Sequence, residues 1–359
     1  MSRVYIMGFV GAGNAGDEAI LAGTLHLLRE RGVTDIGVFS WNPNETERVH
    51  GVRAFPVLPG LTGIKDFAAV LRRGDLLLLG GGSLLQDGEP RIVPFWLSRA
   101  VAAKAKGCTV VFHAQGVGPL RTLGARLLVR VLLPLSASLV TVRDVDSQSL
   151  VAYARPHLVA DPALALPQLA VPKQPKLAVI ALRKCSGREE EERKLVAALG
   201  NLSAEHGLTY AFLPMHIPDD VPLAEDLARR CQGTVVSYSS LAQLREVLAR
   251  AEIVLAMRLH AAILAAGVGT PVVGLAYDPK VRAFFRGLGL GRAVLPWGEE
   301  FQGEHLLEAV NEALVENHAQ RHATAEVLTR MRAHAALAVD LALASWRDEH
   351  GNRRRCSGL

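Results

Sequence analysis

The chain has 359 residues, half of them hydrophobic, and its 40 basic and 35 acidic side chains leave a formal net charge of +5. This length suits two domains better than one, and the well-mixed charges exclude bulk disorder. The basic surplus suits an anionic partner such as a phosphorylated substrate, but no segment has the pattern of a nucleic-acid-binding module. Much of the surplus, Arg353, Arg354 and Arg355, lies at the chain end, where we expect solvated side chains.

In the first half of the chain, short apolar runs alternate with helix-length amphipathic segments. This alternation predicts a parallel sheet with helices on both faces. The predicted buried strands are Val4–Phe9, Ile36–Phe39, Leu76–Leu79, Val110–Ala114 and Leu139–Val142. The most apolar stretch, residues 123–142, is interrupted by Arg126, Arg130 and Pro134. We therefore interpret it as an amphipathic helix followed by a buried strand, and not as a membrane span.

A second series of strands follows a polar, proline-bearing stretch at residues 171–176, which is the best candidate for a linker. The predicted strands of this series are Leu177–Leu182, Tyr210–Leu213, Val235–Val236, Ile253–Ala256 and Pro271–Leu275. From about Glu304 to Trp346 the chain is rich in alanine and predicted to be helical.

These patterns predict an α/β protein with two Rossmann-like domains facing a cleft, a glycosyltransferase-B-like architecture. We expect an N-terminal domain over residues 1–170, a C-terminal domain over 176–325, and a C-terminal helix and basic tail over 326–359, with this helix packing back on the first domain. In open parallel sheets, ligands bind outside the carboxyl ends of the strands, which in a two-domain protein places the site in the cleft.

The cysteines and the first residues predict a cytoplasmic protein. Cys108, Cys185, Cys231 and Cys356 are far apart and form no Cys-x-x-Cys pair, so we expect reduced thiols. The N-terminal residues run directly into a strand pattern, from which we expect no signal peptide. Histidines and carboxylates do not cluster at metal-ligand spacing, so we expect no metal site.

The turn after the first strand, residues 11–18, has the formal pattern G-x-G-x-x-G. Asp17 and Glu18 stand at the start of the following helix, where they would repel a pyrophosphate. No acid follows the second strand near Asn42 to bind a ribose. These features argue against a dinucleotide site and leave two interpretations open, a tight strand–helix turn or a loop that shapes the cleft.

Three other loops at strand ends in the first half carry candidate residues. Gly80–Asp87 begins with three glycines, which serve either the close approach of a ligand to the backbone or a sharp turn. His113 and Gln115 end another strand, although a lone histidine is more often structural. Arg143 and Asp144 close the fifth strand, where an internal ion pair is the plain alternative.

In the second half, cations gather at strand ends. Arg183 and Lys184 follow the first strand of the series, and Lys280 lies on the loop after the last. Arg258 and His260 enter an alanine-rich helix, where a guanidinium, an imidazole and free helix N–H groups are the chemistry of a phosphate site. The alternative for His260 is a structural histidine at the strand–helix turn.

Taken in order, these motifs resemble the polysaccharide pyruvyl transferase family, most closely its bacterial CsaB-type cell-wall branch. The resemblance covers roughly residues 4 to 290. It rests on Gly16–Leu21, Gly80–Asp87, Ala114–Pro119, Val142–Asp144, Asp161–Ala163, Met257–His260 and Tyr277–Val281. The chain departs from the family pattern at Lys184 and Cys185, where a proline and an aromatic residue are expected.

The resemblance implies a glycosyltransferase-B-like fold and phosphoenolpyruvate as the donor, with no metal or other cofactor. The acceptor would be an N-acetylmannosamine unit of a secondary cell-wall polymer precursor on a lipid carrier. The product would be a 4,6-linked pyruvate ketal, whose carboxylate lets S-layer proteins attach. Such an enzyme would work in the cytoplasm, with a location at the inner face of the membrane, peripheral membrane contact and homo-oligomer formation all left open.

The motifs and the resemblance together nominate the site residues. His260 and Arg258 are the expected catalytic residues, and the donor would be bound by Arg183, Arg258, Lys280 and His260. The expected acceptor-binding residues of the first domain are Asn14, Asp17, Glu18, Gly81, Gly82, Gln86, Asp87 and Gln115. Two alternatives remain, a glycosyltransferase of the same architecture that uses a nucleotide sugar, and a non-catalytic polysaccharide-binding protein. The second would display aromatic platforms, whereas aromatic residues make up only 5% of the chain.

Overall fold

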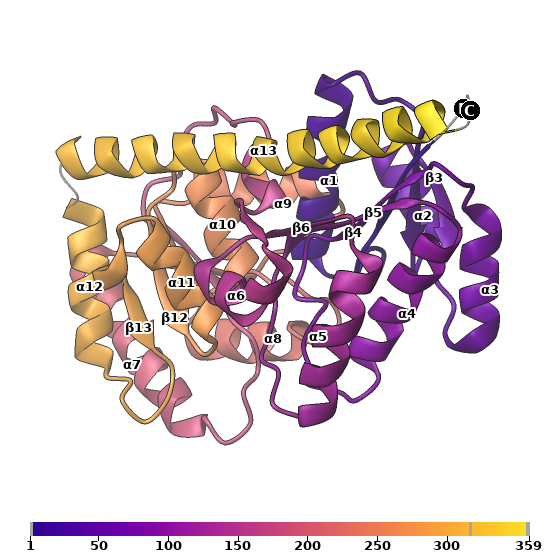
Figure 1. Cartoon of the computed structure of the whole chain (residues 1–359). Coiled ribbons are helices and arrows are strands. Elements are labelled where there is room, and N and C mark those ends of the chain that lie inside the picture. Colours follow the sequence, from indigo (N-terminus) through magenta and orange to yellow (C-terminus); the bar gives the residue numbers. More distant parts are fainter. Residues whose placement is uncertain (1–2, 316–317, 357–359) are drawn as a thin grey trace. The chain divides into compact units, whose positions relative to one another are not determined.

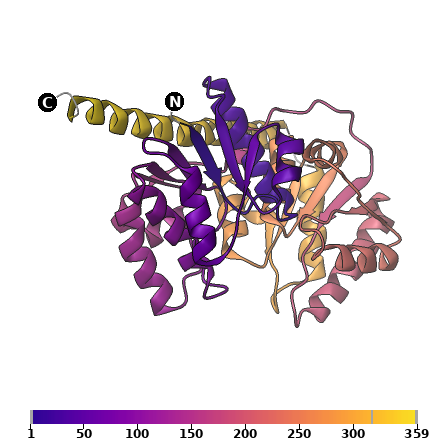
Figure 2. The same cartoon turned by 90° about the vertical axis from the view of Figure 1, so that its right-hand side faces the viewer.

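A computed structural model describes residues 3–315 and 318–356, and the chain divides into two compact units. Unit 1 consists of Met1–Ala12, Asp17–Ala165 and Met331–Leu359, and unit 2 of Gly13–Gly16 and Leu166–Arg330. Each unit is a parallel sheet flanked by helices (Figures 1 and 2). The sequence analysis made predictions about four residues whose side chains lie outside the described part of the structure: Arg353, Arg354, Arg355 and Cys356.

The sheet of unit 1 has seven parallel strands in the order β3-β2-β1-β4-β5-β6-β7. The strands are β1 (Val4–Met7), β2 (Ile36–Ser40), β3 (Arg53–Pro56), β4 (Leu76–Gly80), β5 (Thr109–Gln115), β6 (Leu139–Val142) and β7 (His157–Leu158). β1 pairs with both β2 and β4, so the strand order reverses between β1 and β4. This is the Rossmann arrangement, and its ligand position is the carboxyl end of those two strands.

Helices cover both faces of this sheet, because its central strands are apolar on both sides. All four leucines of Leu76–Leu79 are fully buried: Leu77 and Leu79 pack on one face, and Leu76 and Leu78 on the other. The helices are α1 (Ala15–Glu30), α2 (Pro43–His50), α3 (Gly60–Val70), α4 (Ile92–Ala105), α5 (Leu123–Ser136) and α6 (Val145–Leu150). The predicted helix and buried strand within residues 123–142 are thus confirmed as α5 and β6.

Unit 2 repeats the arrangement with six parallel strands in the order β10-β9-β8-β11-β12-β13. They are β8 (Leu177–Ala181), β9 (Thr209–Phe212), β10 (Thr234–Val235), β11 (Ile253–Ala256), β12 (Val272–Ala276) and β13 (Val294–Pro296). β8 pairs with β9 and β11, which makes the carboxyl ends of β8 and β11 the switch point of this sheet. The helices are α7 (Glu189–His206), α8 (Val221–Arg230), α9 (Leu241–Arg250), α10 (Leu259–Gly267), α11 (Pro279–Gly287) and α12 (Gly303–Val315).

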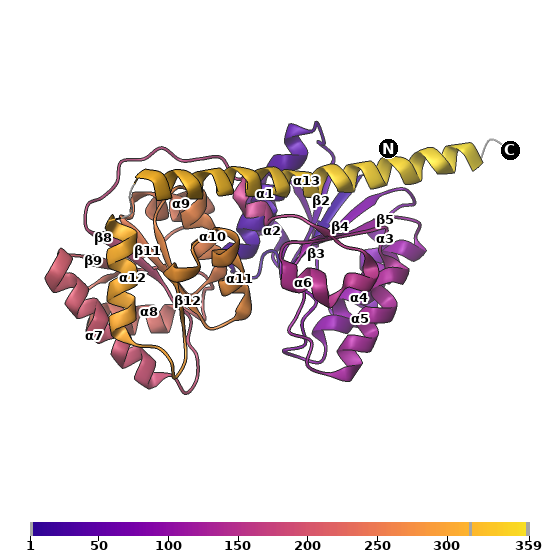
Figure 3. The same ribbon diagram turned by 60° about the vertical axis from the view of Figure 1, so that its left-hand side comes forward.

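The last helix, α13 (His318–Cys356), belongs to unit 1 from Met331 onward. Its residues Val339, Ala342 and Leu343 are buried in the same cluster as β1 and α1, and Figure 3 shows α13 passing beside α1. Outside this cluster, Arg31, the residue after α1, forms an ion pair with Asp340 at 2.6 Å. The C-terminal helix is therefore part of the core of unit 1.

The proposed linker at residues 171–176 is held within unit 2. Lys173 Nζ donates to the carbonyl of Ala251 and to the hydroxyl of Thr270, at 2.9 and 2.7 Å. The two units meet in sequence at Ala165 and Leu166, before this stretch. In the described part of the chain, no helix is long and apolar enough to cross a membrane.

Candidate functional site

The switch point of unit 2 carries the predicted cations. Arg183 follows β8, Arg258 follows β11 and Lys280 follows β12, three adjacent strands whose carboxyl ends lie at one edge of the sheet. Arg258 is the residue before α10, and His260 is the second residue of that helix. The structure therefore places all four predicted donor residues at neighbouring strand ends and helix starts of one unit.

Arg258 is oriented by Asp220, a residue that the sequence analysis missed. The Asp220 carboxylate is almost fully buried and accepts hydrogen bonds from Nε of Arg258, at 3.0 Å, and from Nη2. The same carboxylate also accepts the backbone N–H groups of Met215 and His216, at 3.1 and 2.9 Å. Asp220 thus joins the loop after β9 to the start of α10.

Arg258 keeps binding capacity in spite of this ion pair. A guanidinium has five N–H groups, and Asp220 takes two of them. Within the described part of the chain, the other three donate no hydrogen bond to protein. The side chain is 16% exposed, so an anion that reached it would meet a pre-oriented and partly desolvated cation.

Tyr277 links the other two cations. Nη1 of Arg183 lies 3.4 Å from the Tyr277 hydroxyl, and the Arg183 guanidinium stands 5.0 Å from the ring centre. Lys280 Nζ lies 6.0 Å from the same ring and 3.3 Å from Asp278. Burial lowers the pKa of Arg183, but hydrogen bonding to Tyr277 and the nearby Cys185 and Asp220 outweigh it and raise the pKa overall. Arg183 therefore stays a cation at any working pH.

Cys185, where the sequence analysis expected an aromatic residue, lies close to the cations of unit 2. Burial raises the pKa of its thiol, although Arg183, Arg188 and Arg258 oppose that shift. Cys185 is a free thiol in the structure, and it is protonated at neutral pH, which makes it a weak nucleophile.

His260 packs against the backbone at Gly16, and both residues belong to unit 2. A Cβ atom at position 16 would lie 2.2 Å from Nδ1 of His260, so only glycine allows the ring to occupy this place. The same segment is bound to the loop after β9: the N–H of Ala15 donates to the carbonyl of Met215 at 2.8 Å. Asn14, expected to bind the acceptor in the first domain, is thereby placed in unit 2, where its side chain accepts the N–H of Gly16 at 2.9 Å.

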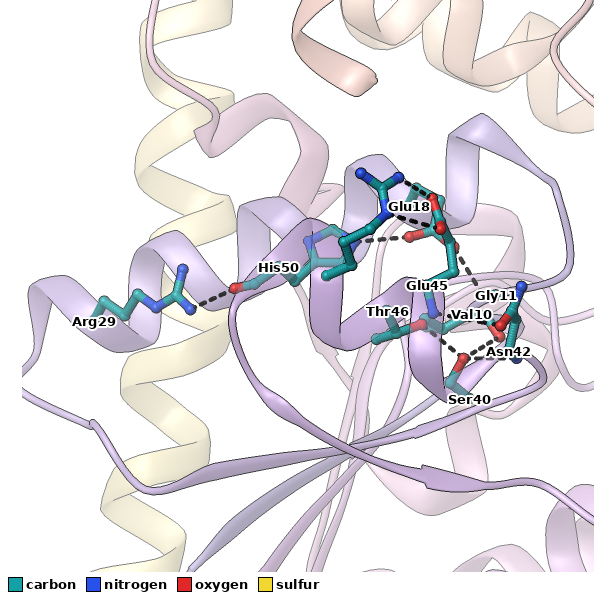
Figure 4. Close-up of polar contacts among 10 residues, drawn as sticks. Val10, Gly11, Glu18, Arg29, Ser40, Asn42, Glu45, Thr46 and His50 are labelled. Atoms are coloured by element: carbon teal, nitrogen blue, oxygen red, sulfur yellow. Dashed lines mark hydrogen bonds and ion pairs between the residues drawn. The ribbon is translucent and has the colours of Figure 1, made fainter. Parts of the chain in front are cut away.

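Most of the predicted acceptor residues build loops of unit 1. Glu18 accepts the N–H of Gly11 at 2.7 Å and pairs with the buried ring of His50 at 2.8 Å (Figure 4). Gln115 is only 1% exposed, and its amide donates to the carbonyls of Gly82 and Gly116, both at 2.8 Å. Both side chains thus stabilise loops of unit 1, and their proposed contact with the acceptor stays a prediction.

Gln86 and Asp87 also stabilise their own surroundings. Gln86 accepts the N–H of Gly88 at 2.6 Å. Asp87 accepts the N–H groups of Arg121 and Thr122 at 2.7 and 2.6 Å, just before α5 begins, and these bonds lower the pKa of its carboxyl.

The glycines after β4 are explained by close packing. A Cβ atom at Gly81, which has φ +88°, would lie 2.2 Å from Cγ2 of Ile20, and one at Gly82 would lie 2.9 Å from Oδ1 of Asp17. These contacts account for both glycines without a ligand. They also place the Asp17 carboxylate against the loop at the switch point.

Arg143 and His113, two further candidates in unit 1, make contacts within the protein that explain their positions. Arg143 and Asp161 form a buried ion pair at 2.7 Å, with Arg143 also donating to Ser83. Burial lowers the pKa of His113 to about 4, and its Nε2 lies 3.3 Å from the Thr24 hydroxyl. His113 is therefore neutral and structural.

Exposed aromatic rings lie at the carboxyl ends of β1 and β2, and sequence reasoning did not single them out. Phe9 and Trp41 are 37% and 39% exposed, with ring centres 6.3 Å apart. Trp41 also stacks on Phe95 of α4 at 5.7 Å. Phe9 and Asp17 line one small cavity of about 10 Å³, so a carboxylate and an apolar ring adjoin at the switch point. The signal in the sequence was an aromatic residue at or just after the end of each of two predicted strands.

A large cavity of unit 2 lies elsewhere. It has a volume of about 1320 Å³ and is lined by Pro175, Glu252 and Pro271, the residues before β8, β11 and β12, and by Arg292. It therefore opens at the amino ends of the strands, opposite the edge where open parallel sheets bind ligands. We place the candidate site at the carboxyl edge, where the cations are. Among the described residues, no group of three or more His, Cys, Asp or Glu side chains could hold a metal ion.

Solved structures of similar fold are distant in sequence. UDP-GlcNAc 2-epimerase from Neisseria meningitidis bound to UDP-GlcNAc is 12% identical over 96% of this chain and 100% of that one, with a TM-score of 0.63. A glycosyltransferase from Rickettsia africae is 11% identical over 98% and 99%, with a TM-score of 0.63. Anabaena HepE in complex with UDP-glucose is 13% identical over 100% of both chains, with a TM-score of 0.60. These similarities confirm the predicted glycosyltransferase-B-like fold.

Sequence comparison identifies the family. No curated protein matches the chain significantly. The family model for polysaccharide pyruvyl transferases matches residues 14–279, well over half of the chain, and includes the segments that carry Arg183, Arg258 and His260. The chain belongs to the polysaccharide pyruvyl transferase family, and is an enzyme that transfers pyruvyl groups to polysaccharide.

Proposed function

We propose that this enzyme transfers the pyruvyl group of phosphoenolpyruvate to an N-acetylmannosamine unit of a lipid-linked secondary cell-wall polymer precursor, as in the CsaB-type branch of the family. The product would be a 4,6-pyruvate ketal, released with inorganic phosphate, and its carboxylate would let S-layer proteins attach. The observation that carries this proposal is the set of three cations, Arg183, Arg258 and Lys280, at adjacent strand ends of unit 2.

The donor has two anionic groups, a phosphate and a carboxylate, and the cations of unit 2 suit them. Arg258, held by Asp220, offers a planar fork to one group, and Arg183 and Lys280, which share the Tyr277 ring, serve the other. In a sheltered site each such charge-assisted contact contributes about 1.5–3 kcal/mol. The N–H groups at the start of α10 add a favourable dipole.

His260 is the proposed acid. Ketal formation needs a proton at the methylene carbon of phosphoenolpyruvate, which becomes the methyl group and leaves an oxocarbenium-like centre. One sugar hydroxyl attacks this centre and phosphate departs; a second hydroxyl then closes the ring. The two hydroxyls release two protons, of which one replaces the proton given by the acid and the other leaves with phosphate. An imidazole titrates near neutral pH, so it suits this donation.

Unit 1 is proposed to bind the acceptor. Asp17 and Phe9 line the same small cavity at the switch point, so a carboxylate that can accept sugar hydroxyls lies beside an aromatic residue. The exposed rings of Phe9 and Trp41 offer an apolar platform on which a sugar can lay its C–H face. The other predicted acceptor residues of this unit would then act by shaping its loops.

A direct assay tests the function. The purified enzyme is incubated with phosphoenolpyruvate and a lipid-linked N-acetylmannosaminyl disaccharide, and the product is examined by mass spectrometry for the gain of one pyruvate less one water, with phosphate release measured in parallel. Phosphoenolpyruvate is also compared with UDP- and GDP-sugars as a stabilising ligand in thermal shift. Stabilisation by a nucleotide sugar alone, without pyruvyl transfer, would instead favour the glycosyltransferase alternative.

The donor assignment has its own test. Arg258→Ala and Arg258→Lys should each weaken phosphoenolpyruvate binding, Ala by about 10- to 100-fold, because Lys keeps the charge but loses the fork. Arg292→Ala, at the opposite edge of unit 2, is the matched control and should bind normally. Wild-type affinity in both Arg258 variants would refute the assignment.

A further inference from the structure

Helix α5 presents an apolar face to solvent. Leu123, Leu127, Val131 and Leu135 recur every four residues and are 83%, 63%, 46% and 68% exposed. At 100° per residue they cover about 120° of the helix surface. The face that packs on unit 1 is formed instead by Ala125, Val129, Leu133 and Ser136, all buried, beside α4. An outward apolar face of this kind marks an interaction surface.

Arginines border this face on one side. Arg126 and Arg130 lie between the buried residues and the exposed leucines on the helix surface, and α5 contains no acidic residue. Both arginines are held in place: Nε of Arg126 donates to the carbonyl of Leu120 at 2.7 Å, and Arg130 stands 5.1 Å from the ring centre of Tyr153. The surface is thus apolar with a cationic border.

We propose that α5 docks the enzyme on an anionic lipid surface, with its exposed leucines and Val131 inserted shallowly among the lipids and Arg126 and Arg130 at the level of the head groups. This is the chemistry of interfacial helices, which combine a buried apolar face with basic residues that attract anionic lipids. With 14 residues, α5 is about 21 Å long and lies along the surface, since spanning needs roughly 20 apolar residues.

The border of arginines favours lipid over a second copy of the chain. In a symmetric dimer the same face meets itself, so the Arg126 and Arg130 rows of the two copies would approach one another. No carboxylate on α5 could neutralise them, so the pairing would be repulsive. An anionic membrane satisfies both the apolar face and the charges.

This docking is separate from the transfer reaction. Only its purpose, to bring the enzyme to an acceptor carried by a lipid, rests on the proposed function. The surface and the cation cluster are in different units and can be tested separately.

The test is vesicle flotation with the full-length enzyme, using vesicles of phosphatidylcholine alone and of phosphatidylcholine mixed with phosphatidylglycerol. The enzyme should bind the mixed vesicles preferentially, and less at high salt. Leu123→Glu and Leu127→Glu should each lower partitioning at least about tenfold, because a charge replaces an inserted apolar side chain. Arg126→Gln should lower it about fivefold, equivalent to the ~1 kcal/mol of one basic residue near an anionic surface.

Leu61→Glu is the matched control, since Leu61 stands in the first turn of α3 and is 79% exposed. It should bind vesicles like the wild type. Pyruvyl transfer to a soluble acceptor analogue should persist in Leu123→Glu, so failure of docking and failure of the proposed function are distinguishable. Three results would overturn the proposal: no binding of the wild type to mixed vesicles, equal binding by Leu123→Glu and Leu61→Glu, or a dimer that Leu123→Glu converts to a monomer without any vesicle binding.

Discussion

The carboxylate of Asp220 gives the sharpest test of how the donor site is built. Oδ2 of Asp220 accepts three hydrogen bonds, from the N–H groups of Met215 and His216 and from Nε of Arg258, while Oδ1 accepts Nη2 of Arg258. In Asp220→Asn, the amide oxygen can keep the first three bonds. The amide NH₂ then faces Nη2, so that two donors oppose each other and the arginine loses its counter-charge.

The magnitude follows from the burial of this pair. The side chains of Asp220 and Arg258 are 1% and 16% exposed, so the interaction is little screened by water. Removing one partner of a buried ion pair costs about 3–5 kcal/mol. For a unit of this size, each kcal/mol corresponds to about 2–4 °C, so the melting temperature should fall by about 6–20 °C.

Calorimetry of the full chain measures this loss, and Asp226→Asn is the matched control. Asp226 lies on α8, pairs with Arg229 and Arg230, and has a side chain 43% exposed, so its loss should cost at most about 1 kcal/mol. Equal changes in melting temperature for Asp220→Asn and Asp226→Asn would contradict the reasoning.

A double variant separates stability from donor binding. Asp220→Asn combined with Arg258→Met removes the unpaired charge, so it should recover part of the stability lost in Asp220→Asn. It should still fail to bind phosphoenolpyruvate tightly, because the guanidinium is absent. Recovery of binding together with stability would mean that Arg258 is structural only.

Four more outcomes are expected. His260→Ala should lower turnover by about 10²- to 10⁴-fold in steady-state assays while circular dichroism stays unchanged, and near-normal turnover in His260→Gln would exclude the acid role. Activity should survive EDTA; full loss on chelation that a divalent ion restores would refute metal-independent transfer. Tyr277→Phe should raise KM for phosphoenolpyruvate more than it changes kcat, because it loses only the hydroxyl that lies near Arg183; an unchanged KM would argue against that contact. The pKa of His113 is about 4 in the folded protein and about 6.5 in the unfolded chain, so between these pH values only the unfolded chain binds the proton. The free energy of unfolding should therefore fall by roughly 3 kcal/mol as the pH is lowered from 6.5 to 4. The free energy of unfolding, measured by urea titration at several pH values in this range, should depend more steeply on pH in the wild type than in His113→Asn. The same pH dependence in both proteins would contradict the prediction.

Much of the fold was predictable because the central strands are continuous apolar runs. Leu76–Leu79 and Ile253–Ala256 are buried on both faces, and no other local structure explains four consecutive apolar residues between turn signals as well. The outer strands β3, β7 and β13 were missed. β3 is partly exposed along its whole length, and β7 has only two residues, so neither carries a strong pattern.

The candidate site was predictable where chemistry follows a strand directly in sequence. Arg183, Arg258 and Lys280 were predicted in this way, and the structure brings them to one edge because the carboxyl ends of parallel strands lie together. Asp220 could not be found, because its partner Arg258 lies 38 residues away and only the sheet brings the two together. The acceptor-binding residues stay a prediction.

Patterns that serve packing and patterns that serve ligands look alike in sequence. Gly81 and Gly82 follow a strand as ligand-binding glycines do, but what requires them is the approach of Ile20 and Asp17. Glu18 likewise lies where a ligand contact is expected, but its carboxylate is hydrogen-bonded to the N–H of Gly11 and to the ring of His50. Side-chain type and spacing state what a residue could do, and the packed neighbours decide which of those roles is left.

Helix α5 illustrates the same division. Its sequence alone established a helix with two faces and too many interruptions for a membrane span. Only the tertiary structure decided that Ala125, Val129 and Leu133 face the core while Leu123 and Leu127 face solvent. The physical reason is that both faces are apolar, so periodicity cannot rank them, and the face that is buried is the one whose side chains fit against α4 and the sheet.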